Sequence, residues 1–424
     1  MGVARQIMGS TRHSAAAVSA RATGTRMQIQ RLPTAALSFL QSACGAQAVP
    51  HDDPSTHART ELERMVREQE LPGAQYVAVT ADRTLLEVQA GVTDVATGAR
   101  MQRATPQMAY SVSKIVTAVA VLQLVDEGQL ELDAPLNRYF SAHPYGERVT
   151  IRTLLAHTSG VPNPMPLTWF ALEGERLDRD AALHALLARH PKRSAAPGEA
   201  YGYSNIGYWL LEKAIESVSG QDYALHVEQR VFAPLAVARE AIAFDLAPGR
   251  ALATGHARRF TFMNAVLHAL TPRRYWAGPH RGWSRSARVR SLGRGYGGLF
   301  CSASALAAVL QDLLRAEPTS MSSRARDQMF AEQRTSDGKP IGGTLGWVTG
   351  ELHGVRYFGK QGGGLGFHGN VRVYPHLGVA TVLLANRTEV SPGPIDARSD
   401  VIDAGFAAQI SRVTRPRARC PRGR

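Results

Sequence analysis

The pattern of apolar and polar positions predicts β-strands near both ends of the chain and helices between them. Six strand-like runs are bounded by turn residues, and the last four follow one another at hairpin spacing. These runs are 76–80, 85–90, 346–350, 355–359, 370–374 and 379–385. Strands at both ends around a helical middle indicate one antiparallel sheet to which both ends of the chain contribute.

Three longer runs have the apolar spacing of helices, at 56–70, 111–127 and 394–411. The second is apolar on nearly every face, which is typical of a helix buried inside a protein. Residues 150–245 alternate helices and turns with few strand-like runs. The predicted fold class is therefore α+β, with an antiparallel β-sheet flanked by helices and an inserted helical lobe.

The folded domain is expected at 52–411, between two basic end segments. Its α/β lobe would comprise about 56–150 and 297–411, and its helical lobe about 150–296. The Arg- and Pro-rich tail at 412–424 cannot bury a core, and we expect it to be disordered.

The formal net charge of +14 is concentrated in three segments of the 424-residue chain. Five arginines lie in 1–51, nine in 255–296 and six in 412–424, and none of these segments contains an acidic residue. The remainder has a net charge of −6, so the body of the protein is mildly acidic. Neither a zinc-finger spacing nor an aromatic and basic RNA-binding motif accompanies the arginines, and we expect no nucleic-acid partner.

Residues 1–51 contain a weak secretory-signal pattern outside the expected fold. From Met27, a short region with Arg31 is followed by an apolar stretch and then by Ala46-Gln47-Ala48, an A-x-A cleavage pattern. We therefore expect export to the periplasm or the medium. The alternative is an unstructured leader on a cytoplasmic protein.

Ser111-Val112-Ser113-Lys114 places an alcohol and an amine one helical turn apart at the start of the predicted buried helix. A hydroxyl in the first turn lies beside unpaired backbone N–H groups and the positive helix end, which favour a developing alkoxide. Lys114 shares a helix face with Ser111, and burial disfavours its ammonium form, so the amine can accept a proton near neutral pH. The simpler alternative is a helix-start serine with a solvated lysine, but a lysine in so apolar a helix needs a partner or a function.

Tyr203-Ser204-Asn205 is the second candidate element. A phenol beside one or two ammonium groups is shifted toward phenolate and can then relay a proton to or from a leaving group. The Asn205 amide can bond both Lys114 and a substrate carbonyl. Alternatively, the segment is a turn after Pro197-Gly198 in which Tyr203 is a packing residue.

Lys360-Gln361-Gly362-Gly363, between two strand-like runs, is the third element. Glycines here let a substrate lie against the strand as an added β partner. The N–H groups of Gly363 and Ser111 can face one another as an oxyanion hole, in which each donor is typically worth ~3–4 kcal/mol of transition-state stabilisation. Taken alone, the segment is better explained as a glycine-rich hairpin loop.

Together, the three elements resemble those of the penicillin-recognising serine hydrolases, which include class C β-lactamases, D,D-peptidases and related esterases. In that family S-x-x-K, Y-x-N and K-T-G occur in this order, as 111–114, 203–205 and 360–362 do here. The resemblance covers about 56–411 and includes the flanking segment 154–160. His157 in that segment is expected to be a structural turn residue rather than a catalytic one.

This resemblance implies an α/β lobe beside a helical lobe, with a cleft between them. Ser111 would be acylated, and Lys114 and Tyr203 would share general-base and general-acid duty. Asn205 would position the substrate, and Lys360 would tune Tyr203 and meet a substrate carboxylate.

Gln361 stands where the family has threonine. That threonine helps to bind the carboxylate of β-lactams and D-Ala peptides, so the change favours an esterase or peptidase. We therefore expect a serine hydrolase that acts through an acyl-serine on a small ester, amide or peptide. The alternatives are a true β-lactamase or D-Ala-D-Ala carboxypeptidase, and a non-catalytic binding or sensor module of the same fold.

No metal or organic cofactor is expected for this chemistry. The cysteines, Cys44, Cys301 and Cys420, lie too far apart in the sequence for a disulfide framework or a metal cluster.

The basic segment 258–294 begins with the pattern of an amphipathic helix at 258–270 and continues with Arg-rich text around Trp276 and Trp283. Such a helix can lie on an anionic membrane surface. It can equally form a lid over the cleft, or pack on the helical lobe with a solvated arginine face. Its apolar face would comprise Phe260, Met263, Val266, Leu267 and Leu270.

Overall fold

The computed structural model of the chain describes residues 54–164, 168–245, 249–388 and 394–414. The predicted leader lies outside the described residues, as do residues 415–424 of the predicted tail. The last helix, α11 (Pro394–Thr414), continues three residues beyond its predicted end at residue 411.

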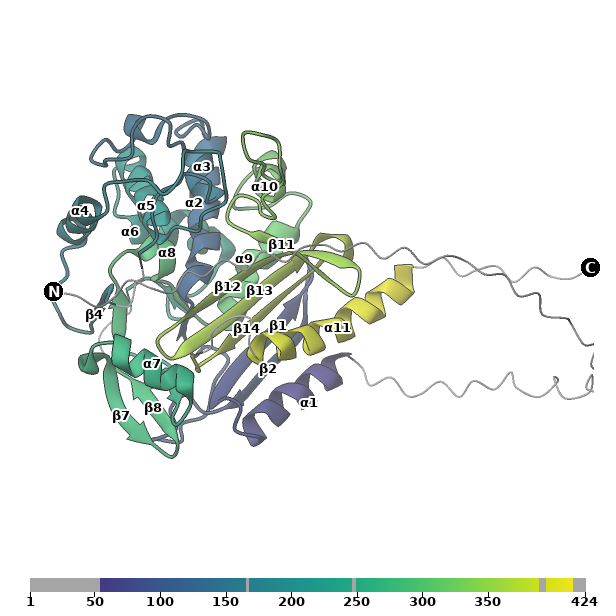
Figure 1. Cartoon of the computed structure of the whole chain (residues 1–424). Helices are drawn as coiled ribbons and strands as arrows, with labels where there is room; N and C mark the ends of the chain where they lie inside the picture. Colours follow the sequence, from purple (N-terminus) through teal and green to yellow (C-terminus); the bar gives the residue numbers. More distant parts are fainter. Residues whose placement is uncertain (1–53, 165–167, 246–248, 389–393, 415–424) are drawn as a thin grey trace, which may run out of the picture. The chain divides into compact units, whose positions relative to one another are not determined.

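A six-stranded antiparallel sheet joins the two ends of the described chain, in the order β11-β12-β13-β14-β1-β2 (Figure 1). The N-terminal strand β1 pairs with the C-terminal strand β14, from Ala74 opposite Ala385 to Val79 opposite Ala380. The predicted sheet built from both ends of the chain is thereby confirmed. The strands are β1 (Gly73–Val79), β2 (Thr84–Gly91), β11 (Val348–Leu352), β12 (Val355–Gly364), β13 (Phe367–Tyr374) and β14 (Val379–Ala385).

Helices cover both faces of the sheet, so every residue of β1 is buried. Alternate side chains of a strand point to opposite faces. Tyr76 and Ala78 pack into a core shared with α1 (Pro54–Arg67) and α11, which lie side by side on one face (Figure 1). Val77 and Val79 face the larger core, to which α9 (Ala303–Leu314) and α2 (Ser113–Asp126) contribute.

Helix α2 runs through the larger core, and its residues from Ser113 to Leu124 are all buried. This confirms the predicted buried helix, although its first predicted residue, Ser111, lies in a preceding 3-10 turn, η1 (Tyr110–Val112). The other helices of the region are α3 (Ile151–Leu155), α4 (Arg179–Arg189), α5 (Asn205–Ser219), α6 (Tyr223–Val227), α8 (Arg294–Gly297) and α10 (Ser323–Phe330). Shorter 3-10 or π turns are η2 (Leu136–Arg138), η3 (Glu228–Phe232), η4 (Ala233–Leu235), η5 (Arg273–Tyr275) and η6 (Pro375–Leu377).

The predicted helical lobe also contains short β-strands that the sequence pattern did not indicate, from β4 at Phe170 to β9 at Ser291. A two-residue turn at Arg281-Gly282, in which both φ angles are positive, reverses the chain between His280 and Trp283. Positive φ at both central residues is the requirement of a hairpin turn. The small sheets are β6 (His256–Arg258), β8 (Trp283–Ser286) and β7 (Trp276–His280); β4 (Phe170–Leu172) and β9 (Val289–Ser291); and β3 (Gln107–Met108), β10 (Phe300–Cys301) and β5 (Ile242–Ala243).

The helix predicted at 258–270 is shorter than expected, because α7 comprises Phe262–Leu270. Arg258 belongs to β6, and the Thr261 hydroxyl caps the helix by accepting from the Asn264 N–H at 3.3 Å. Phe260 precedes this cap and is not part of the helical face. Among the described helices, none combines the length and the apolar character that a membrane span requires.

Candidate active site

The Ser111 hydroxyl lies in the tight turn between β3 and α2. The turn begins at Tyr110, whose φ of 46° is rare for a bulky residue. Strand β12 packs directly against it, since a Cβ on Gly362 would lie 2.2 Å from the Ala109 carbonyl oxygen. Position 362 therefore requires glycine, and the close approach brings the strand to the nucleophile turn.

Lys114 is completely buried one turn along α2 from Ser111. Its Nζ lies 2.7 Å from Asn205 Oδ1, 2.6 Å from the Tyr296 carbonyl oxygen and 3.3 Å from Ser111 Oγ. Burial, helped by the nearby Lys360, lowers the pKa of Lys114 well below its usual value. The predicted direction of this shift is thereby confirmed.

A neutral Lys114 fits its surroundings atom by atom. A neutral amine has two N–H donors and one lone pair. The amide oxygen of Asn205 and the carbonyl oxygen of Tyr296 accept the two donors, since neither oxygen can donate. The third position on Nζ faces Ser111 Oγ at 3.3 Å: an ammonium donates to this oxygen, whereas a neutral amine accepts from its hydroxyl, which can itself accept from the Tyr203 hydroxyl at 2.6 Å.

Tyr203 approaches Ser111 from a segment 92 residues further along the chain. Its ring also lies 4.9 Å from Lys114 Nζ and 5.5 Å from Lys360 Nζ, measured to the ring centroid. Burial raises the pKa of the Tyr203 phenol, and the hydrogen bond with Ser111 only partly offsets this. The predicted shift toward phenolate is therefore wrong, and Tyr203 is a protonated phenol in this environment.

Two local interactions fix the Tyr203 segment. The Ser204 hydroxyl caps α5 by accepting from the Gly207 N–H at 2.9 Å, which places Asn205 in the first turn of the helix. His157 Nδ1 accepts from the Ser204 N–H at 3.2 Å, and the His157 ring lies 4.5 Å from the Tyr203 ring. His157 has a φ of 57°, so it is a turn residue, as expected, and it supports Tyr203 directly.

The segment Lys360 to Gly363 lies within β12, not between two strands as predicted. β11 pairs with β12 only as far as Gly359, and among the described residues no strand pairs with the following residues of β12 on that side. Lys360 is buried beside Tyr203, and burial lowers its pKa to about 7. Gln361 and Gly363 are exposed. An added strand can pair with such an edge, and the predicted oxyanion hole of Ser111 and Gly363 stays a prediction.

Two further groups support Lys114, and the sequence did not single them out. The Tyr296 carbonyl that binds Nζ belongs to α8, which is clamped to α2 by the hydrogen bond from Thr117 Oγ1 to Gly295 O at 2.7 Å. Glu212 Oε2 accepts from the N–H groups of Arg294 and Gly295, both at 2.8 Å. A backbone carbonyl leaves no sequence signal. Glu212 does leave one, because, like Lys114, it is a charged residue within an apolar helical run and needs a partner or a function.

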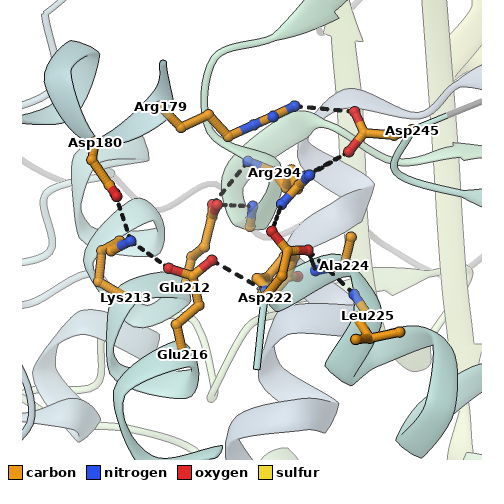
Figure 2. Close-up of polar contacts among 12 residues, drawn as sticks. Arg179, Asp180, Glu212, Lys213, Glu216, Asp222, Ala224, Leu225, Asp245 and Arg294 are labelled. Atoms are coloured by element: carbon orange, nitrogen blue, oxygen red, sulfur yellow. Dashed lines mark hydrogen bonds and ion pairs between the residues drawn. The ribbon is translucent and has the colours of Figure 1, made fainter. Parts of the chain in front are cut away.

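Figure 2 shows how the far side of α8 is held. Arg294 Nη1 pairs with Asp222 at 2.6 Å, and its Nε donates to Asp245 at 2.9 Å. Asp245 also pairs with Arg179 at 3.1 Å. Because Arg294 is largely buried, removing one partner would leave an uncompensated charge, so this network fixes the turn that presents the Tyr296 carbonyl.

Comparison with known proteins agrees with this arrangement. The model of the Beta-lactamase family matches residues 58–404. Penicillin-binding protein 4 from Amycolatopsis lactamdurans is 26% identical over 347 residues, 78% of this chain and 84% of that protein. Protein flp from Staphylococcus aureus is 26% identical over 189 residues, 43% of this chain but only 37% of flp. The solved D-amino acid amidase from Ochrobactrum anthropi SV3, complexed with D-phenylalanine, has a TM-score of 0.72 at 18% identity, covering 84% of this chain and 100% of the amidase.

The family match spans most of the described residues, including all three motif segments. The similarity to the amidase structure independently supports the fold, an antiparallel sheet flanked by helices. The protein therefore belongs to the β-lactamase family of serine hydrolases.

Proposed function

We propose that the protein hydrolyses small esters or amides through an acyl-serine intermediate on Ser111. The observation that carries this proposal is the environment of Lys114. Its two oxygen acceptors occupy both N–H groups of the neutral amine, and the remaining lone pair faces Ser111 Oγ at 3.3 Å. A positioned amine of lowered pKa is a suitable general base for a serine nucleophile.

Acylation would begin as Ser111 Oγ forms a bond to the substrate carbonyl carbon and its proton passes to Lys114 Nζ. Collapse of the tetrahedral intermediate breaks the bond to the leaving oxygen or nitrogen, which takes the proton of the Tyr203 hydroxyl. The Lys114 ammonium then gives its proton to the Tyr203 phenolate, which also contacts Ser111 Oγ, and both groups return to their neutral forms. A protonated resting Tyr203 fits this general-acid role, because a phenolate has no proton to donate.

Deacylation would use the same groups in reverse. Water attacks the acyl carbon, its proton passes to Lys114, and the ester bond to Ser111 Oγ breaks. Ser111 recovers a proton from Lys114, and the acid product leaves. The edge of β12 beside this site, with which no described strand pairs, offers backbone partners to an amide substrate.

Gln361 and Lys360 bear on the choice of substrate. Gln361 is exposed at the position where the family threonine helps to bind a carboxylate. Lys360, whose pKa burial lowers to about 7, carries only part of its charge at neutral pH. Both features favour neutral esters and amides over β-lactams and peptides that end in a carboxylate. A small amide substrate is also consistent with the likeness to a D-amino acid amidase.

The test compares hydrolysis of p-nitrophenyl esters, hydrolysis of nitrocefin and labelling by a fluorescent penicillin. Ester turnover that is lost in Ser111→Ala and Lys114→Ala supports the proposal. The exposed Ser141→Ala and Lys339→Ala are matched controls and should retain activity. Turnover of nitrocefin would instead indicate a β-lactamase, and a stable penicilloyl adduct a carboxypeptidase. A folded protein that is inert toward every probe would indicate a non-catalytic module.

A further inference from the structure

Strongly exposed apolar side chains lie along α7, with two rings at or just before its start and a leucine at its end. Phe260 is 89% exposed, Phe262 81% and Leu270 58%, and these are the three most exposed large hydrophobic side chains among the described residues. Figure 1 shows α7 beside the hairpin of β7 and β8. Clustered exposed rings are unusual in a soluble domain and mark a surface that contacts another phase or molecule.

The two rings are held outward by a fixed backbone. Phe260 has a φ of 63°, and the preceding Arg259 N–H donates to the Gly282 carbonyl at 2.8 Å, which ties the loop to the β-hairpin turn. The opposite side of α7 packs on that hairpin, since His268 Nε2 lies 2.9 Å from Ser284 Oγ and its ring 3.9 Å from that of Trp276. The helix therefore has one packed face and one free face.

The arginines of the basic segment differ in whether they pair with acidic residues. Arg274, Arg285, Arg288 and Arg294 pair with acids from elsewhere in the fold. Arg259, Arg273 and Arg281 are exposed, and none of them takes part in an ion pair with any described residue. Arg258 and Arg290 also form no ion pair with a described residue, but they donate to the backbone carbonyls of Gln69 and Glu175. Of Arg259, Arg273 and Arg281, the first lies over the Phe260 ring, 4.9 Å from its centroid.

An open groove lies between α7 and the hairpin. Its lining includes Arg259, Phe260, His268, Arg273 and Trp276. Two guanidinium groups and aromatic surfaces around one groove match an amphiphilic anion, with a phosphate at the arginines and hydrocarbon at the rings.

We propose that this α7 surface binds a lipid bilayer that contains anionic phospholipid. Arg259, Arg273 and Arg281 contact phosphates, while Phe260 and Phe262 enter the boundary between headgroups and acyl chains. A second copy of the chain is the poorer occupant, because a symmetric contact would set these arginines against themselves. An acidic protein is also a poorer partner, because rings that project this far suit a soft medium better than a flat protein surface. This inference does not depend on the proposed reaction.

The test is co-sedimentation of the full chain with vesicles of phosphatidylcholine alone or mixed with phosphatidylserine. Binding should be much stronger to the mixed vesicles. Phe260→Ser/Phe262→Ser should weaken it by about tenfold or more per ring, and Arg259→Gln/Arg273→Gln by roughly fivefold per arginine. Leu225→Ser and Arg148→Gln, at exposed positions elsewhere, are matched controls for lost apolar area and lost charge.

The basic ends of the chain are present in every variant, so differences between variants report on α7 alone. The urea midpoint and far-UV circular dichroism of the Phe and Arg variants should match those of the natural protein, which shows that they are folded. Equal binding to both vesicle types, or full binding by the Phe variant, would overturn the proposal. So would light scattering that shows a dimer dissolved by Phe260→Ser/Phe262→Ser, because the patch would then be a contact between copies.

Discussion

Replacing Glu212 by glutamine should remove a loss of stability that the protein suffers as pH rises from 4.5 to about 7. Burial raises the pKa of Glu212 from 4.5 to about 7; the Gly295 N–H, Arg294 and Arg179 oppose the rise and Glu216 adds to it. In the unfolded chain this carboxyl releases its proton first. The contribution of Glu212 to stability is therefore fully present below pH 4.5 and is lost as pH rises through about 7.

The size of this effect follows from the pKa difference. Because one pKa unit corresponds to about 1.4 kcal/mol, the rise from 4.5 to about 7 amounts to about 3 kcal/mol. Glutamine cannot ionise, but its amide oxygen can still accept from the N–H groups of Arg294 and Gly295. The free energy of unfolding of Glu212→Gln, relative to the natural protein, should thus increase by about 3 kcal/mol across this pH range.

Urea unfolding at a series of pH values measures this difference directly, and other titrating groups cancel in it. Glu147→Gln, at an exposed position, is the control for the loss of one carboxylate. Parallel curves for Glu212→Gln and the natural protein would refute the reasoning. Glu212→Ala removes the acceptor altogether and leaves two buried N–H groups unpaired, which should cost roughly 2–6 kcal/mol. By releasing the turn that carries the Tyr296 carbonyl, it should also lower kcat for ester hydrolysis, and Glu212→Gln should restore most of that loss.

Three other variants test the site. Tyr203→Phe should slow acyl transfer by about 10²-fold or more, measured as kcat for a p-nitrophenyl ester, and an unchanged rate would remove Tyr203 from the mechanism. Gly362→Ala forces a Cβ to within 2.2 Å of a carbonyl oxygen, so it should lower the free energy of unfolding, measured by urea titration, by about 1–3 kcal/mol. In the control Gly202→Ala the new Cβ meets open space, and the free energy of unfolding should not fall in this way. Inhibition by a carboxylate product should weaken as pH rises through about 7, because Lys360 loses its charge there. Lys360→Met should abolish that pH dependence. An inhibition constant that still follows pH in the variant would show that another group binds the carboxylate.

The parts of the fold that the sequence predicts are those with a local pattern. The buried helix α2 and the strand β1 are mostly apolar, and their burial is what these apolar runs indicate. The glycines at the end of β12 break such a pattern, but they belong to the strand because they pair with β13 as far as Gly364 opposite Phe367. The hairpin of β7 and β8 was missed for a related reason, since its strands contain Gly278 and Pro279, residues that disfavour strands.

Within the site, spacing along one helix predicts the pairing of Ser111 and Lys114, because three residues make nearly one turn. The meeting of Tyr203 with Ser111 has no local signal and was expected from the resemblance of the motifs. The Tyr296 carbonyl is a backbone group, which any residue would supply, so tertiary structure alone reveals it.

The prediction of a phenolate at Tyr203 was wrong because it required Lys114 to be charged, whereas the role of base toward Ser111 requires it to be neutral. An ammonium group on Lys114 would stabilise a phenolate at Tyr203, but a protonated Lys114 cannot act as the base toward Ser111. Burial decides between these roles, because the same loss of water that lowers the pKa of Lys114 and of Lys360 also raises that of Tyr203. Removing water therefore favours the neutral form of all three groups together. A neutral amine that accepts a proton and a neutral phenol that donates one are the two partners that attack by Ser111 and departure of the leaving group require.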